Sequence, residues 1–222
     1  MFRAALALVM TSVLASPALA QDWFPWSQPG YRAPTYSAPR YSEDNFGPRP
    51  RPMGQALMSG GPRPDISPSR PERISFVSSY APGTIVIDTS ARKLYLVQSP
   101  RDALIYPISV GREGFTWTGT ERISRIANWP DWHPPAEMRQ RQPHLPVKMT
   151  GGVYNPLGAK AMYLGHSLYR IHGTDDARTI GRATSSGCFR MTNGHVTDLS
   201  RRVGVGTTVV VVNRLSARTA GY

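Results

Sequence analysis

Short apolar runs rich in β-branched residues constrain the fold of this chain more than any other feature. Residues 84–89 (TIVIDT) and 93–97 (KLYLV) flank the turn-like Ser90-Ala91-Arg92, which is the pattern of a β-hairpin. Further strands are predicted over 104–110, in two short pieces within 161–171, and over 207–212. These runs indicate a domain built mainly from β-strands.

A single helix is predicted among these strands. Val196, Leu199 and Val203 recur at helical spacing within residues 193–203. We therefore expect one mainly β domain over residues 75–214, followed by a short C-terminal tail over 215–222.

Residues 112–160 show few regular signals and are rich in Trp, Pro, Gly and Arg. A segment this long without clear elements is usually functional, as a lid or a binding loop. Its large aromatic residues either wall a groove or pack against the sheet as core. They are Trp117, Trp129, Trp132 and Tyr154.

The first 20 residues have the pattern of an export signal. Arg3 precedes an apolar run over 4–15, and Ala18-Leu19-Ala20 is a small-x-small cleavage pattern. The run is short for a bilayer span, so we expect cleavage after Ala20 and a soluble, exported protein. An uncleaved anchor is the alternative.

Residues 21–74 are expected to form a disordered tail or linker. Eleven prolines lie between Pro25 and Pro71, interleaved with Arg, Ser and aromatic residues, without an apolar period. Such composition is typical of polyproline-like or disordered chain. The segment is either a spacer or a docking segment whose Tyr and Arg side chains stack on a partner.

The chain has one cysteine and a net charge of +12. A single cysteine excludes an intramolecular disulfide and a zinc site with several cysteine ligands. Exported proteins usually carry cysteines in pairs or none, so Cys188 is either a functional thiol or an inert buried residue. The charge suits an anionic partner, but no nucleic-acid recognition motif is present.

His172 and Cys188 form the candidate chemical centre. His172 ends a predicted strand, and Cys188 follows it after the turn-like Ser185-Ser186-Gly187. An imidazole can activate a thiol, and amides at Gly187 and Cys188 can bind an oxyanion. Arg190 shares a face with Cys188 if the segment is extended, and there it can bind a carboxylate. The alternative is a buried cysteine and a core histidine.

The segment IHGTDDARTIGRATSSGCFRM resembles the catalytic domain of L,D-transpeptidases, also called the YkuD domain. The family signature is His-Gly, a spacer, Ser/Thr-x-Gly-Cys, and Arg or Asn two residues later. The resemblance covers about residues 80–213 and leaves out the tail. Many members have His where this chain has Ser186.

The resemblance implies a β-sandwich or barrel with one short helix after Cys188 and a long capping loop region. Cys188 would be the nucleophile and His172 the proton acceptor and donor, oriented by a backbone carbonyl at Gly173. Ser186 and Gly187 would shape the turn and the oxyanion site. The implied substrate-binding residues are Arg190, Tyr154 and Ser185.

The implied chemistry is two-step acyl transfer in the periplasm, at the cell wall, without a metal or cofactor. The cysteine takes the acyl group of a peptidoglycan tetrapeptide stem and releases D-alanine. The acceptor amine belongs to another stem, which gives a 3→3 cross-link, or to an envelope protein. The alternatives are an L,D-carboxypeptidase or hydrolase on the same scaffold, and a non-catalytic peptidoglycan-binding module. We expect no nucleic-acid partner and no stable membrane insertion.

Overall fold

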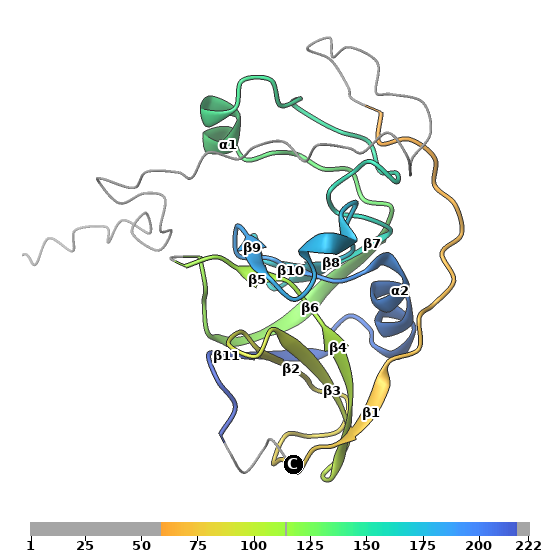
Figure 1. The fold of residues 1–222 in the computed structure, drawn as a ribbon, viewed down its shortest axis with the longest axis vertical. Helices are drawn as coiled ribbons and strands as arrows, with labels where there is room; N and C mark the ends of the chain where they lie inside the picture. The colour runs from red at the N-terminus through yellow and green to blue at the C-terminus, as the bar shows by residue number, and fades with distance from the viewer. Residues whose placement is uncertain (1–58, 114, 217–222) are drawn as a thin grey trace, which may run out of the picture. The chain divides into compact units, whose positions relative to one another are not determined.

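The computed structural model describes residues 59–113 and 115–216, which lie within one compact unit of the chain. The predicted export signal, residues 21–58 and residues 217–222 lie outside the described residues. The elements, in chain order, are β1 (Glu72–Ser75), β2 (Ile85–Asp88), β3 (Lys93–Ser99), β4 (Asp102–Pro107), β5 (Val110–Gly111), β6 (Gly119–Asn128), α1 (Ala136–Arg141), β7 (Lys160–Leu164), β8 (Arg170–His172), η2 (Ala177–Thr179, a 3-10 turn), β9 (Ala183–Ser185), β10 (Phe189–Arg190), α2 (Asn193–Arg202) and β11 (Thr208–Val212) (Figure 1).

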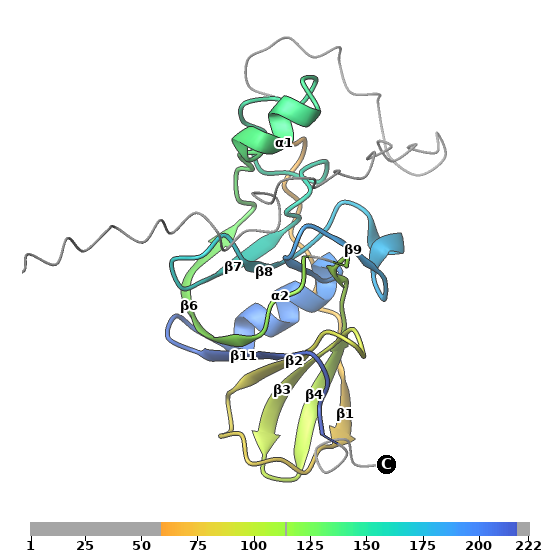
Figure 2. The ribbon, with the colours of Figure 1, turned by 90° about the vertical axis from the view of Figure 1, so that its left-hand side faces the viewer.

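Nine of these strands form one sheet, in the order β1-β4-β3-β2-β11-β6-β7-β8-β10, and β5 pairs with β9. Most neighbours are antiparallel, but three pairs are parallel: β11 with β2, β10 with β8, and β5 with β9. Figure 2 shows helix α2 between the part of the sheet that holds β2 to β4 and the part that holds β7 and β8. The predicted mainly β fold with a short helix after Cys188 is confirmed.

Both parts of the sheet contribute to one core. Ile85 and Ile87 of β2 point into it from one side, and Met162 and Ile171 of β7 and β8 from the other. Val86, between the two isoleucines, faces a second cluster on the opposite side of the sheet. Because side chains alternate along a strand, the core-facing residues of β7, β8 and β10 leave the other face of these strands free for a site.

Helix α2 fixes the position of the segment that follows Cys188. The hydroxyl of Thr192 accepts a hydrogen bond from the backbone N–H of His195 at 3.2 Å, which caps the helix. Val196 and Leu199 are fully buried on its inner face. The cap and the buried face together hold the end of β10 against the core.

The region over 112–160 is more regular than its sequence indicates. It contains the ten-residue strand β6 and the short helix α1. A register shift between Ile123 and Arg125 breaks the alternation of β6, and most of its residues are exposed or half-buried. Its strand conformation comes from pairing with β11 and β7, which are distant in sequence.

Residues 59–71, here called the strap, are ordered on the domain, although the sequence assigned them to the tail. Strap carbonyls at Gly60 and Pro62 accept hydrogen bonds from Tyr154 and Val153. At the other end of the strap, the N–H of Ser69 donates to the carbonyl of Gly194 at 3.0 Å. Extended proline-rich chain leaves its carbonyls free for such contacts, and β1 then pairs with β4. The folded region therefore starts before the predicted boundary at residue 74.

No helix within the described part of the chain is long and apolar enough to cross a membrane.

Candidate active site

The parallel pairing of β8 with β10 brings the candidate residues together. Arg190 lies opposite His172, and Phe189 lies opposite Ile171. Phe189 and Ile171 are in the core, so His172 and Arg190 face the other way. Cys188 precedes Phe189 and therefore lies at the level of Arg170, on the same face.

His172 is buried and held in one orientation. Its side chain hydrogen-bonds to the carbonyl of Gly173 through Nδ1, at 2.7 Å. A carbonyl only accepts, so Nδ1 carries the proton and Nε2 keeps its lone pair. Burial lowers the pKa of His172 to about 3, helped by the charges of Arg190 and Arg170 and opposed by the Gly173 carbonyl. The imidazole is therefore neutral at neutral pH.

Cys188 is half-buried, and its Sγ lies 3.7 Å from the carbonyl oxygen of Leu168. Burial raises the pKa of the thiol. The nearby charges of Arg170 and Arg190 oppose that increase. The group is thus a protonated thiol beside two cations, and a base must remove its proton before it can attack.

The turn before Cys188 is shaped by Ser185 and Gly187. The Ser185 hydroxyl donates to the carbonyl of Cys188 at 2.5 Å and accepts from the N–H of Gly187 at 3.2 Å. Gly187 has a φ of +105°, and a Cβ there would lie 2.8 Å from the ring of Tyr169. Only glycine fits this position. Ser185 is buried and its hydroxyl acts within the turn, whereas Ser186 is exposed.

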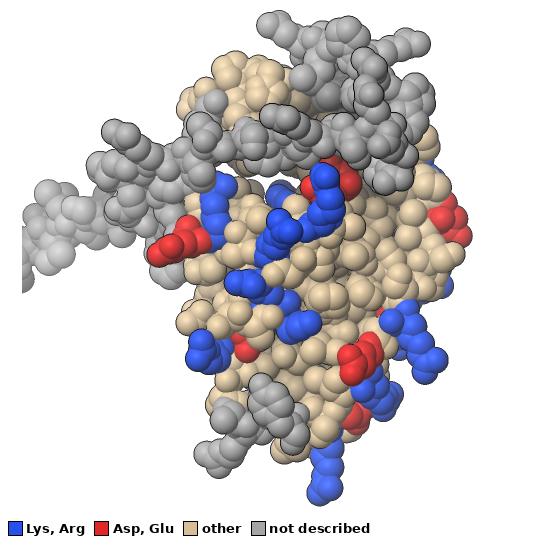
Figure 3. Space-filling model, in the orientation of Figure 1, with Lys and Arg blue, Asp and Glu red and all other residues tan. Residues whose placement is uncertain are grey.

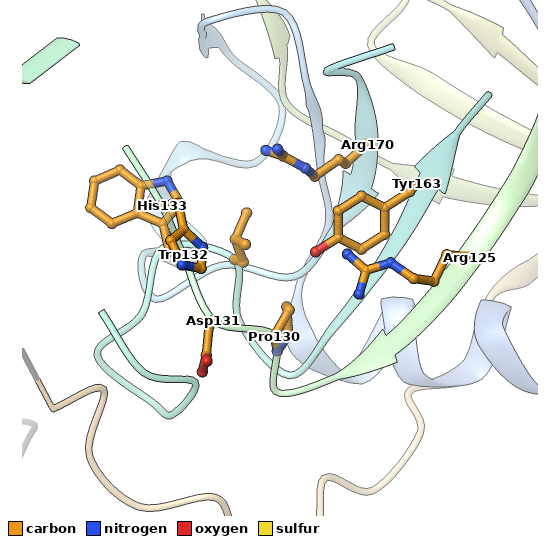
Figure 4. Close-up of a pocket in the computed structure, with 8 residues that line it drawn as sticks. Arg125, Pro130, Asp131, Trp132, His133, Tyr163 and Arg170 are labelled. Carbon is orange, nitrogen blue, oxygen red and sulfur yellow. The ribbon is translucent and has the colours of Figure 1, made fainter. Parts of the chain in front are cut away.

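A pocket of about 380 Å³ adjoins this centre. Its floor includes Arg125, Tyr163 and Arg170, which are cross-strand neighbours on β6, β7 and β8. Figure 4 shows Trp132 and His133 on the opposite side of the pocket, from the capping region. The guanidinium of Arg125 lies 3.8 Å from the centre of the Tyr163 ring, and that of Arg170 lies 5.3 Å from it.

Comparison with known proteins identifies the domain. The family model of the YkuD L,D-transpeptidase catalytic domain matches residues 82–211, which includes every residue of the centre described above. The chain belongs to the YkuD L,D-transpeptidase family.

Similar proteins carry the same family name. The chain is 38% identical over 131 residues to a putative L,D-transpeptidase of Fuscovulum blasticum, covering 58% of this chain and 68% of that protein. It is 30% identical over 151 residues to the probable L,D-transpeptidase YbiS of Escherichia coli, covering 64% of this chain and 48% of that protein. The solved structure of L,D-transpeptidase 3 from Mycobacterium tuberculosis aligns with a TM-score of 0.47 at 14% identity, over 58% of this chain and 60% of that one.

The aromatic residues of the transpeptidase capping region have different surroundings. Trp132 lines the pocket, while Trp117 stacks on Tyr169 at 4.6 Å and packs against the core. Trp129 takes a left-handed φ of 41°. Tyr154 packs against Gly61 of the strap and does not line the pocket. Both alternatives for these aromatic residues therefore occur: Trp132 lines a pocket, and Trp117 packs against the core.

Two residues of the candidate site were not predicted from the sequence. Arg170 precedes His172 by two positions, so strand alternation alone would have placed it on the same face. Asn193 carried no signal. Its Oδ1 accepts from the N–H groups of Ala159 and Thr174 at 2.9 and 3.3 Å, and its Nδ2 donates to the Thr174 carbonyl at 3.0 Å. It fixes the backbone next to Gly173, where a Cβ would lie 2.2 Å from Oδ1.

Basic side chains gather on one face of the transpeptidase domain (Figure 3). Lys and Arg side chains gather across the middle of the face shown in Figure 3, over the segment that holds β8 to β10. Within residues 59–113 and 115–216, no three His, Cys, Asp or Glu side chains are placed to hold a metal ion.

Proposed function

We propose that the protein is a peptidoglycan L,D-transpeptidase that uses Cys188 as its nucleophile. One observation carries the proposal: Cys188 and a neutral, oriented His172 lie on one face of two paired strands, with Arg170 and Arg190 beside them. A protonated thiol next to an unprotonated imidazole is the starting state for general-base activation of a nucleophile.

The first step is acylation. Nε2 of His172 takes the thiol proton, and Sγ of Cys188 bonds to the carbonyl carbon that precedes the terminal D-alanine of a tetrapeptide stem. The tetrahedral intermediate collapses, the bond from carbon to the D-alanine nitrogen breaks, and His172 returns the proton to that nitrogen. D-Alanine leaves, and the stem remains attached as a thioester.

The second step transfers the acyl group. An amine acceptor attacks the thioester carbonyl, His172 removes its proton, and the sulfur leaves and is reprotonated. The acceptor is the side-chain amine of a second stem, which gives a 3→3 cross-link, or an amine of an envelope protein. Water in place of the amine would make the same site a carboxypeptidase.

The surrounding residues support this chemistry in defined ways. The Gly187 N–H already donates to Ser185, so the backbone N–H of Cys188 is the candidate oxyanion donor. Arg190 lies at the level of His172, and we expect its guanidinium to contact the stem peptide. The export signal predicted over residues 1–20 supports the proposal of a periplasmic location, where the stems are.

Mass spectrometry of the intact protein tests the proposal. Incubation with a stem tetrapeptide should add the mass of the tripeptide acyl group to wild-type protein and none to Cys188→Ala. Adding an amine acceptor should release a peptide product with the acceptor attached. A normal adduct in Cys188→Ala would contradict the assignment of Cys188 as the nucleophile. Release of free tripeptide alone would identify a hydrolase.

A further inference from the structure

A row of side chains crosses the three neighbouring strands β6, β7 and β8 and leads to Cys188, which directly precedes β10. Arg125 on β6 lies opposite Tyr163 on β7, and Tyr163 lies opposite Arg170 on β8. The parallel pairing of β8 with β10 extends the row to Cys188. Residues in one cross-strand row share a face, so a bound molecule can extend along the row from the pocket to the sulfur.

The two arginines of this row lack an acidic partner. Among the described residues, no carboxylate lies within ion-pair distance of Arg125 or Arg170, whereas five other basic side chains are paired with aspartates. Nε of Arg170 is buried without a hydrogen-bond partner in the described part of the chain. Asp131 also lines the pocket, but it is paired with Lys148 at 2.6 Å.

The arrangement of the pocket fits a planar anion such as a carboxylate. Arg125 stacks on Tyr163, which leaves the edge of its guanidinium free to donate. Arg170 faces the same space from the next strand but one, as Figure 4 shows. Planar guanidinium groups bind carboxylates through paired N–H donors, and here Trp132 closes the opposite side of the pocket.

We propose that the Arg125–Tyr163–Arg170 pocket binds a free carboxylate of the peptide substrate while the reacting group lies at Cys188. This inference rests on the proposed transpeptidase function and adds a specificity-determining site to it. The carboxylate belongs either to the acyl donor stem or to the amine acceptor. In both cases the pocket binds a carboxylate. The two cases can be told apart because the donor reacts in the acylation step and the acceptor reacts in the transfer step.

Arg125→Gln is the variant that tests the pocket. Arg125 is exposed and lies at the end of the row that is far from Cys188, so its substitution leaves the surroundings of Cys188 intact. A substitution at Arg170 would change those surroundings, because the charge of Arg170 acts on the thiol. Arg122→Gln is the matched control, because Arg122 is an exposed arginine of the same strand whose guanidinium donates to the Gly206 carbonyl instead. Both variants lose the same charge.

The donor arm measures acylation of Cys188 by a stem tetrapeptide and by the same peptide with its side-chain carboxyl groups amidated. The acceptor arm measures transfer from the acylated enzyme to D-alanine and to D-alaninamide. In the arm whose substrate binds in the pocket, Arg125→Gln should raise KM for the carboxylate form about tenfold. It should leave KM for the amide form unchanged. Arg122→Gln should not discriminate between the two forms.

The experiment distinguishes failure of the pocket proposal from failure of the proposed transpeptidase function. If wild-type Cys188 is acylated but Arg125→Gln affects carboxylate and amide forms equally in both arms, the pocket proposal is wrong and the transpeptidase proposal stands. If no peptide acylates Cys188, the proposed function itself fails. Equal losses in Arg122→Gln and Arg125→Gln would show that only the overall charge matters.

Discussion

His172 and Cys188 are both shifted toward their neutral forms, and this determines how the thiol is activated. Burial lowers the pKa of the imidazole to about 3 and raises the pKa of the thiol. A resting thiolate–imidazolium pair is therefore disfavoured, and in the proposed mechanism the proton moves when the sulfur attacks. The hydrogen bond to Gly173 aims the free lone pair by fixing which nitrogen carries the proton.

The pH dependence of acylation follows from these shifts. Because His172 stays unprotonated well above its pKa of about 3, kcat/KM for acylation should change little between about pH 7 and about pH 5. An inflection near the ordinary histidine pKa of 6.5 would contradict a neutral imidazole beside a neutral thiol.

His172→Ala should lower kcat by about 10²- to 10⁴-fold, while Cys188 should still react slowly with a small alkylating agent.

At the scale of elements, the site depends on how the start of α2 is joined to the ends of β7 and β8. Asn193 is the first residue of α2, and its amide binds the backbone at Ala159 and Thr174. Thr174 follows Gly173, whose carbonyl orients His172. We therefore expect Asn193 to act as a positioning residue that orients His172, the proposed base, through the backbone.

Asn193→Ala should separate positioning from stability. The change leaves two N–H groups and one carbonyl without their partner, so unfolding free energy should fall by about 1–3 kcal/mol. If Asn193 orients His172, kcat should also fall well below the transition temperature with KM little changed. Ser200→Ala, which removes a hydrogen bond within α2 to the Thr197 carbonyl, is the control and should leave kcat unchanged. Equal kcat in both variants would assign Asn193 a structural role only.

At the scale of the whole domain, a buried polar contact connects strand β4 to helix α2. The hydroxyl of Tyr106 on β4 donates to Asp198 of α2 at 2.8 Å, and Arg202 forms two hydrogen bonds to the same carboxylate. Burial alone raises the pKa of Asp198, but these hydrogen bonds and the charge of Arg202 outweigh it, so the pKa is lowered. Asp198 and His172 both therefore link folding to pH.

Acid should destabilise the domain in a way that His172 partly controls. The pKa of His172 is about 3 when folded, against 6.5 as the ordinary value, so the unfolded chain binds the proton more readily. Unfolding free energy should then fall as the pH is lowered from about 6.5 toward about 3. Urea unfolding of wild type and His172→Gln at several pH values measures this. The variant should lose less stability over that window, and parallel curves would refute the linkage.

Much of the local structure was predictable because it depends on neighbours in sequence. The hairpin of β2 and β3 follows from short apolar runs around a turn-like segment, and the helix α2 follows from the helical spacing of apolar residues. The order His172-Gly173, then Gly187-Cys188, then Arg190 carries the family resemblance. Strand β6 and the ordered strap were missed, since their conformation comes from hydrogen bonds to segments far away in sequence.

The sequence by itself indicated several of the strands, among them β2, β3 and β11, and that Cys188 and Arg190 share a face if their segment is extended. Only the tertiary structure decided that β10 pairs with β8 in the register that sets Arg190 opposite His172, and that the row continues to Tyr163 and Arg125. The physical reason is that register between strands is set by backbone hydrogen bonds and by packing of the shared core. Neither is local, so local spacing cannot report it.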